Sequence, residues 1–144
     1  MRRDAGCLCG RLRARVEGDP VYVNVCHCLA CQRRTGSAFS YNAYFDQSQV
    51  QVDGESMLFP RISDEGRTIR HRFCPSCGTT VWWDLDLVPG LYGIPLGLFE
   101  DPTFAPTPKV SAWEQSRRLL LDLPDTVRHS DGPSLTSREE LGRS

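Results

Sequence analysis

The chain contains the segment Cys26-His27-Cys28-Leu29-Ala30-Cys31, in which three cysteines follow the spacing C-x-C-x-x-C. Cys7-Leu8-Cys9 adds a C-x-C pair, and Cys74-Pro75-Ser76-Cys77 adds a C-x-x-C pair followed at once by Gly78. A C-x-x-C pair brings two sulfur atoms together across a tight turn, and the glycine lets the backbone fold beneath a bound ion. These motifs hold all seven cysteines of the chain, so the spacing predicts metal binding.

The number of cysteines also restricts their chemistry. Seven is odd, so internal disulfides cannot pair all of them. No apolar segment follows the basic start Met1-Arg2-Arg3-Asp4, as a secretory signal would require. We therefore expect the cytoplasm, a reducing compartment in which clustered cysteines are more often metal ligands or redox groups than disulfides.

Seven thiols divide naturally into four plus three. A closed structural zinc site takes four ligands, whereas a catalytic site takes three and keeps one position open. The triad Cys26, Cys28 and Cys31 is local and suits the open site. The remaining cysteines would form the closed site: Cys7, Cys9, Cys74 and Cys77. That site would close a loop of 65 positions between its two pairs, which should stabilise the fold strongly.

Other arrangements stay open at this point. One zinc with four ligands and three spare thiols is possible, and so is a site that combines triad cysteines with Cys74 and Cys77. A redox C-x-x-C at 74–77 is a third option, although the βαβ context of thioredoxin-like motifs is missing. An iron–sulfur cluster also uses thiolates, but the triad lacks a local fourth cysteine, which favours zinc.

The composition is that of a globular protein. Of 144 residues, 40% are hydrophobic and 24% are charged, a balance that excludes disordered and fibrous chains. The formal net charge is −1, so we expect neither nucleic acid nor a membrane surface as a partner. No apolar run approaches the roughly 20 residues that a membrane-spanning helix needs. Arg11, Arg13 and Arg15 are interpreted as a solvated face of one strand.

Short runs with a period of two predict a mainly β fold of antiparallel strands with little helix. The expected strands are 11–17, 21–25, 38–45, 49–53, 68–73, 79–83 and 91–96. One or two helical turns are expected within 27–34, ending before Gly36, while 111–121 is ambiguous. Ser137 to Glu140 matches a capping box, but few residues follow it, so a stable helix is not expected. We predict one domain over 1–129 and a flexible tail over 130–144.

Two pairs of neighbouring residues are candidates for the rim of a cleft. Trp82 and Trp83 would point to opposite faces of a strand, so one belongs to the core and the other is free to line a cleft. Arg33 and Arg34 follow the triad and would offset thiolate charge or bind an anionic substrate. We interpret one of these two arginines as an ordinary exposed residue.

The cysteine framework resembles the family of glutathione-dependent formaldehyde-activating enzymes, which includes the centromere protein V type domain. The resemblance covers roughly residues 5 to 128, with a weaker match at Gly97 to Pro102, where Phe99-Glu100 replaces a Leu-Asp-like pair, and with Trp113 at a usual tryptophan position. The strongest matches are Gly6-Cys7-Leu8-Cys9-Gly10, the segment from Cys26 to Phe39, and Phe73-Cys74-Pro75-Ser76-Cys77-Gly78-Thr79.

The resemblance implies an Mss4-like fold, a tent of β-sheets with two zinc ions per chain. A structural zinc would bind Cys7, Cys9, Cys74 and Cys77, and a catalytic zinc would bind Cys26, Cys28 and Cys31. The implied activity is that of a carbon–sulfur lyase, which condenses glutathione reversibly with formaldehyde to S-hydroxymethylglutathione. The implied partners are a small-molecule thiol and an aldehyde, and the sequence indicates no oligomeric state.

The chemistry suits a three-thiolate zinc, whose open position can hold a substrate thiol as the thiolate that attacks the aldehyde. His27 is a candidate proton donor, but it lies between two ligands, so packing or a backbone contact is the favoured interpretation. The loop after the triad offers Arg34, Gly36 and Ser37 for a glutathione carboxylate.

Two other functions are compatible with the same cysteines. The alternative to the lyase is a non-catalytic zinc module that binds another macromolecule, which would have a fourth protein ligand at the second zinc or an exposed apolar patch. A third and lesser option is a redox or metal sensor that releases zinc when Cys26, Cys28 and Cys31 are oxidised.

Overall fold

The computed structural model describes residues 1–118, 122–135 and 137–143, and these form two β-sheets and one α-helix. The helix is α1 (Leu29–Thr35). The strands are β1 (Arg2–Gly6), β2 (Arg13–Glu17), β3 (Tyr22–Cys26), β4 (Ser40–Asp46), β5 (Val50–Asp53), β6 (Met57–Ile62), β7 (Thr68–Phe73), β8 (Thr80–Leu85), β9 (Leu91–Pro95), β10 (Val110–Ala112) and β11 (Arg128–His129). Four 3₁₀ turns complete the described elements: η1 (Gln47–Gln49), η2 (Leu96–Leu98), η3 (Glu114–Ser116) and η4 (Arg138–Arg143).

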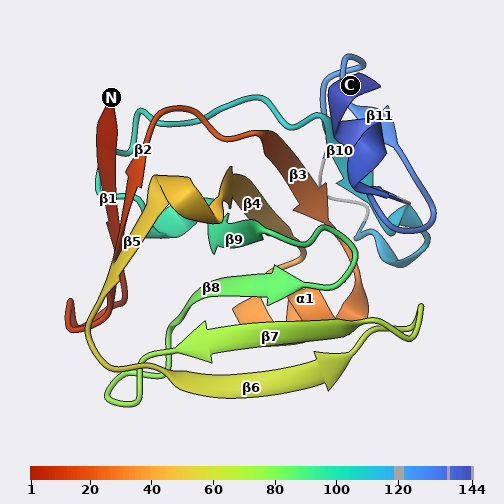
Figure 1. The fold of residues 1–144 in the computed structure, drawn as a ribbon. Helices are drawn as coiled ribbons and strands as arrows, with labels where there is room; N and C mark the ends of the chain where they lie inside the picture. Colours follow the sequence, from red (N-terminus) through yellow and green to blue (C-terminus); the bar gives the residue numbers. More distant parts are fainter. Residues whose placement is uncertain (119–121, 136, 144) are drawn as a thin grey trace.

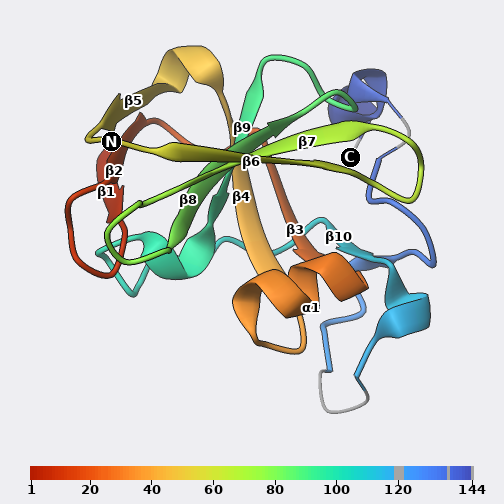
Figure 2. The same cartoon turned by 90° about the horizontal axis from the view of Figure 1, so that it is seen from below.

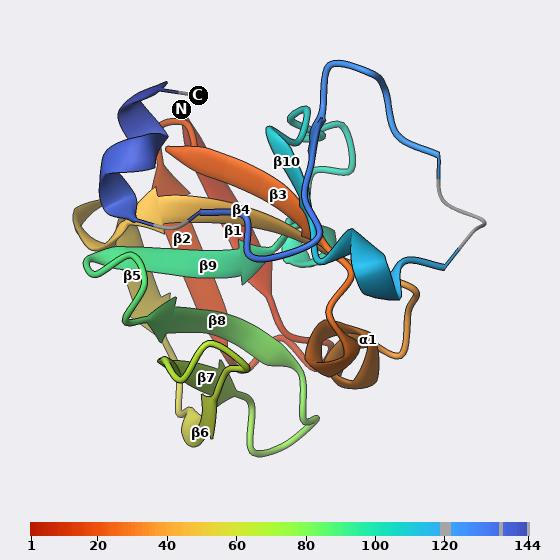
Figure 3. The same cartoon turned by 90° about the vertical axis from the view of Figure 1, so that its right-hand side faces the viewer.

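The small sheet has the order β1-β2-β5, and the large sheet has the order β11-β10-β3-β4-β9-β8-β7-β6 (Figure 1). Figure 3 shows β4, β9, β8 and β7 following one another across the large sheet, with α1 at one end of them. The mainly β prediction with little helix is therefore confirmed. The pairing is antiparallel except that β10 runs parallel to both β3 and β11. This is possible because long connections separate β3 from β10 and β10 from β11.

The small sheet packs on one face of the large sheet and forms the first core with it. Alternation along β2 and β4 selects the residues that face inward. Leu12, Ala14 and Val16 meet Ala43 and Phe45, and each of these five side chains is almost wholly removed from solvent. Trp82 belongs to this core, whereas Trp83 belongs to a second cluster with Tyr22 and Tyr44. The prediction that the two tryptophans serve opposite faces is confirmed.

All seven predicted strands are present as β2, β3, β4, β5, β7, β8 and β9. The strands β1, β6, β10 and β11 were not predicted. β6 contains Pro60 and exposes Met57, Leu58, Phe59 and Ile62 on both of its faces, so its sequence has no period of two. β10 and β11 are too short for a pattern. The ambiguous segment 111–121 holds the end of β10 and η3, and its residues 119–121 lie outside the described ones.

The predicted helical turns are α1, which ends at Gly36 with a φ of 68° (Figure 2). That left-handed conformation costs glycine little and lets the Gly36 N–H bond to the Gln32 carbonyl at 2.8 Å. Within the described residues no helix combines the length and the apolar character needed to cross a membrane.

The predicted tail over 130–144 and the domain boundary at 129 stay predictions. In the structure Leu135 is buried beside Tyr22 and Val88. Arg138 donates a hydrogen bond to Asp46 at 2.8 Å and another to the Pro89 carbonyl. The described part of this segment thus contacts the second cluster.

Gly93 on β9 provides the space in which Trp83 and Tyr44 lie. A methyl group at this position would come within 2.5 Å of Trp83 Nε1 and 2.8 Å of Tyr44 Cε1. Gly93→Ala should therefore force both rings to move and lower the free energy of unfolding by about 1–3 kcal/mol. Urea unfolding followed by tryptophan fluorescence measures this change.

Gly97→Ala is the matched control, because an added methyl group there would meet no atom within 4 Å. It should leave stability unchanged or raise it slightly. Equal midpoints for the two variants would contradict the role assigned to Gly93.

Candidate functional site

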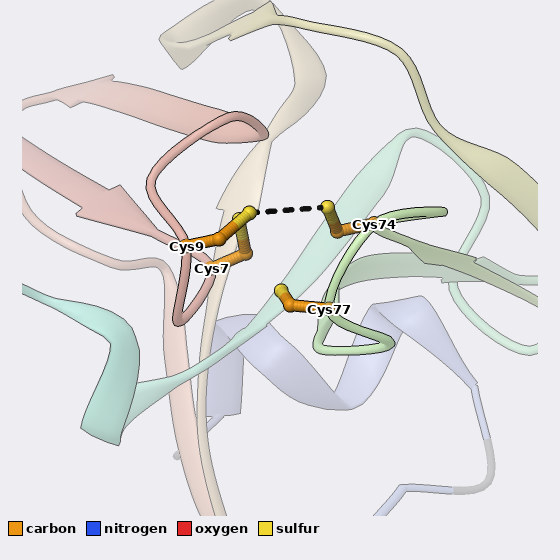
Figure 4. A group of neighbouring side chains, drawn as sticks. All are labelled: Cys7, Cys9, Cys74 and Cys77. Atoms are coloured by element: carbon orange, nitrogen blue, oxygen red, sulfur yellow. Dashed lines mark hydrogen bonds between the residues drawn. The ribbon is translucent and has the colours of Figure 1, made fainter.

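Four cysteines from two distant turns converge at one point (Figure 4). Cys7 and Cys9 come from the turn between β1 and β2, and Cys74 and Cys77 come from the turn between β7 and β8. The four sulfur atoms lie within 4.8 Å of one another. The Sγ atoms of Cys7 and Cys9 are 3.6 Å apart, and those of Cys9 and Cys74 are 3.7 Å apart. Tetrahedral zinc with Zn–S bonds of about 2.3 Å separates its sulfurs by about 3.8 Å, so this four-cysteine cluster fits such an ion.

The two turns that carry this cluster have the same backbone geometry. In each, a glycine with a φ near 80° follows the second cysteine: Gly10 at 79° and Gly78 at 77°. The Gly10 N–H donates to the Cys7 carbonyl at 3.0 Å, and the Gly78 N–H donates to the Cys74 carbonyl at 2.8 Å. The left-handed glycine thus folds each turn back beneath its sulfur pair.

The second group consists of Cys26 at the end of β3 and of Cys28 and Cys31 at the start of α1. Their sulfur atoms also lie within 4.8 Å of one another. Cys28 caps the helix, because its Sγ accepts the Cys31 N–H at 3.2 Å. Its Sγ lies 2.8 Å from that of Cys31, so a shared metal would move these two sulfurs slightly apart. The structure thus groups the cysteines as four and three, and no triad cysteine shares a cluster with Cys74 and Cys77.

The three-cysteine cluster favours one ionised thiol even without a metal. Hydrogen bonds from Cys26 and Cys31, together with the Cys31 backbone N–H, lower the pKa of Cys28. Contacts with Cys28 and Cys31, together with burial, raise the pKa of Cys26. At Cys31 the hydrogen bond with Cys26 lowers the pKa, but the bond with Cys28 and burial outweigh it, so the pKa rises to about 12. Without a metal the negative charge therefore lies on Cys28, and the charge of a bound cation would be needed to ionise the other two thiols.

The three-cysteine cluster opens into a cavity of about 290 Å³ on the second face of the large sheet. Alternate residues of each strand form the floor of the cavity, because every second side chain of a strand points to the same face. They are Asn24 and Cys26 of β3, Asn42 and Tyr44 of β4, Ile69 and His71 of β7, and Trp83 and Leu85 of β8. The walls include four arginines and two acidic residues: Arg33, Arg34, Arg61, Arg67, Asp64 and Glu65.

Arg34 is held in place at the edge of this cavity. Its guanidinium lies over the Trp83 ring, 4.7 Å from the centroid, and donates a hydrogen bond to Ser40 Oγ at 2.6 Å. The Ser40 hydroxyl donates to Asn42, whose amide donates to Asn24 Oδ1 at 3.1 Å. A stacked, hydrogen-bonded guanidinium is pre-ordered for a carboxylate, because little side-chain freedom is lost on binding.

The other predicted contact residues lie elsewhere. Gly36 ends α1 and Ser37 donates its N–H to Thr35 Oγ1 at 3.0 Å, and neither lines the cavity. Their part in substrate binding stays a prediction. His27 is fully buried, with Nε2 2.8 Å from Ser111 Oγ, and it is also absent from the cavity wall. This position agrees with the packing role favoured for it.

Sequence reasoning missed several cavity residues. Trp113 lines the cavity and has a φ of 56°, the only positive φ of a non-glycine residue in the described ranges. Arg61 and Arg67 flank the β6–β7 turn, and His71 lies on β7. The alternation over 68–73 shows that Ile69 and His71 share a face, but it does not show which face borders the triad.

The model of the glutathione-dependent formaldehyde-activating enzyme family matches residues 2–116. The chain belongs to this family. The matched range includes both cysteine clusters and α1. The resemblance predicted from the cysteine motifs is thereby confirmed.

Among solved structures, a Rhodobacter sphaeroides protein has a similar fold, with a TM-score of 0.55 and 24% sequence identity. The similarity covers 69% of this chain and 91% of that protein. The comparison with curated proteins gave no match.

Cys74→Ser should remove one metal ion per chain and lower the free energy of unfolding by more than about 4 kcal/mol. Cys74 is fully buried between the two sheets, so its loss opens the cluster that joins them. Metal analysis of the purified protein and urea unfolding measure the two effects.

Cys28→Ser is the matched variant in the three-cysteine cluster. It should also remove one metal ion but cost much less stability, because β3 and α1 are adjacent in the chain and need no long loop closure. Equal losses of stability in the two variants would contradict the division into a structural and a functional cluster.

Proposed function

We propose that this protein is a zinc-dependent carbon–sulfur lyase that condenses glutathione, or another small thiol, reversibly with formaldehyde to S-hydroxymethylglutathione. The observation that carries the proposal is that three clustered thiols share one cavity with a pre-ordered arginine. Membership of the formaldehyde-activating family supports the reaction class. The two cysteine clusters support two zinc ions per chain.

In this proposal Cys26, Cys28 and Cys31 hold the catalytic zinc, and Cys7, Cys9, Cys74 and Cys77 hold the structural one. Zinc bound to three thiolates supplies an open position that keeps a substrate thiol ionised near neutral pH. In the described part of the chain, no fourth Cys, His, Asp or Glu joins the three-cysteine cluster within 4.8 Å. This open arrangement favours the lyase. The non-catalytic zinc module would have a closed second site or an exposed apolar patch, and the apolar side chains exposed on β6 are the feature that fits it.

The cavity residues give the thiol substrate its orientation. Tyr44, Trp83 and Leu85 form an apolar part of the cavity floor, which would limit the access of water to the reacting sulfur. Arg34 would receive a substrate carboxylate at a fixed distance from Cys28 and Cys31, since α1 carries Arg34 and Cys31 and is capped by Cys28. Formaldehyde itself offers almost no binding surface, so the thiol partner has to supply the binding energy.

We place this chemistry in the cytoplasm. All seven cysteines are free in the structure, although several lie close enough together to be oxidised. Thiols that serve as metal ligands need a reducing compartment to remain available.

The direct test is NMR exchange spectroscopy on an equilibrated mixture of glutathione, formaldehyde and their adduct, with and without zinc-loaded protein. The uncatalysed reaction already proceeds, so the exchange rate is the informative quantity. We expect faster exchange with the protein and none of that acceleration with Cys28→Ser. A protein that holds two zinc ions and leaves the rate unchanged would contradict the proposal.

Arg34→Gln tests the carboxylate contact. It should raise the KM for glutathione about 10- to 100-fold with little change in kcat, because a hydrogen-bonded ion pair contributes about 1.5–3 kcal/mol to binding. The same variant should leave exchange with 2-mercaptoethanol, a thiol without a carboxylate, unchanged. A similar loss with both thiols would show that Arg34 supports the cavity rather than the substrate.

A further inference from the structure

His71 is a buried histidine in the floor of the cavity. It lies on β7 opposite Phe59 of β6 and Trp83 of β8. Its ring packs between theirs, with centroid distances of 6.4 Å to Phe59 and 5.7 Å to Trp83. Only 8% of the residue is exposed, yet it lines the same cavity as the three-cysteine cluster. The aromatic neighbours therefore fix its orientation beside the reacting groups.

The imidazole is not fully satisfied by the protein. Its Nδ1 atom is shielded from solvent and has no hydrogen-bond partner in the described part of the chain. An unpaired buried polar atom lowers the stability of the folded state. The other polar side chains of the cavity floor differ in this respect, since Asn24 and Asn42 bond to each other and to serines. Because Nδ1 is shielded, a substrate cannot reach it. Nε2 is not shielded in this way and also lacks a hydrogen-bond partner in the described residues, so it is the ring nitrogen that stays open to a substrate in the cavity.

The charged groups around His71 keep it neutral. Burial lowers its pKa to about 4, and the positive charges of Arg34 on α1 and Arg61 on β6 add to this effect. The Cys28 thiol at the start of α1 acts in the opposite direction, and Trp83 on β8 carries no charge. At neutral pH the ring thus has one N–H donor and one acceptor nitrogen. Such a ring is suited to polarise a carbonyl by hydrogen bonding and is a poor proton carrier.

The proposed reaction needs such a donor. Thiolate ligands give much of their charge to a metal and leave it a weak Lewis acid, so the aldehyde oxygen needs stabilisation from another source. We propose that His71 is a catalytic residue whose neutral imidazole donates a hydrogen bond from Nε2 to the aldehyde oxygen while the carbon–sulfur bond forms. This inference rests on the lyase function proposed above.

The step balances without a change in His71. A sulfur electron pair forms the new carbon–sulfur bond, and the π pair of the carbonyl bond moves to oxygen. The thiol proton has been released to water, and the oxygen then takes one proton from water. His71 stabilises the developing negative charge and returns to its starting state, as an oxyanion-hole donor does.

His71→Phe and His71→Gln separate catalysis from structure. Phenylalanine keeps a ring between Phe59 and Trp83 and removes the unpaired nitrogen, so the melting temperature should stay unchanged or rise. In the exchange assay the kcat of His71→Phe should fall about 100-fold, the typical effect of losing one oxyanion donor. The KM for glutathione should change less than about twofold. His71→Gln restores an N–H donor, so its kcat should be at least about tenfold higher than that of His71→Phe.

A second measurement uses the unmodified protein and does not depend on any variant. The imidazole ¹⁵N resonances of His71 should show a neutral ring at pH 7. They should shift when S-hydroxymethylglutathione is added but not with S-methylglutathione, which lacks the oxygen. Saturation with the hydroxymethyl adduct without any such shift would overturn the assignment.

The outcomes distinguish the two proposals. If the wild-type protein accelerates exchange and His71→Phe retains its kcat, or changes only KM, the role of His71 is wrong and the lyase function stands. If the zinc-loaded wild-type protein gives no acceleration, both proposals fail together.

Discussion

The convergence of four thiols from two turns is the constraint on which the rest of the structure depends. The β1–β2 turn and the β7–β8 turn are 65 positions apart between Cys9 and Cys74, yet their sulfurs lie at the separation that one tetrahedral ion requires. The first core already packs the two sheets together, and a shared ion would add a direct link between these distant segments. A metal ion bound by the four-cysteine cluster would fix β7 and β8, and with them His71 and Trp83, relative to the small sheet.

The large sheet then uses its two faces for different purposes. One face packs on β1 and β2 and is almost entirely apolar. The other carries Asn24, Asn42 and His71 among aromatic side chains and forms the cavity floor. Adjacent residues therefore have different roles. Trp82 packs in the first core, and Trp83 lines the cavity. Burying the polar side chains of Asn24 and Asn42 would be unfavourable if they lacked partners. The hydrogen bonds that link them through Ser40 to Arg34 offset this loss of hydration.

The proposed chemistry divides among separate elements. The junction of β3 and α1 supplies three thiols, α1 supplies the stacked guanidinium of Arg34, and β7 supplies the neutral His71. A carbonyl as small as formaldehyde cannot be positioned by its own contacts, so the thiol has to be bound and the oxygen has to find a donor already in place. Burial produces the neutral state of His71 and, at the same time, removes water that would compete for that oxygen.

The sequence by itself determined the local features. The cysteine spacing indicated metal binding and the family, alternation indicated seven strands, and Gly36 marked the end of the helix, because turn geometry and strand period depend on neighbouring residues only. The tertiary structure decided which cysteines meet, which strand faces border the triad, and that His71 rather than His27 lies in the cavity. These facts depend on pairing between strands far apart in the chain, and a period of two fixes only which residues share a face. It does not determine which other element or cavity that face contacts.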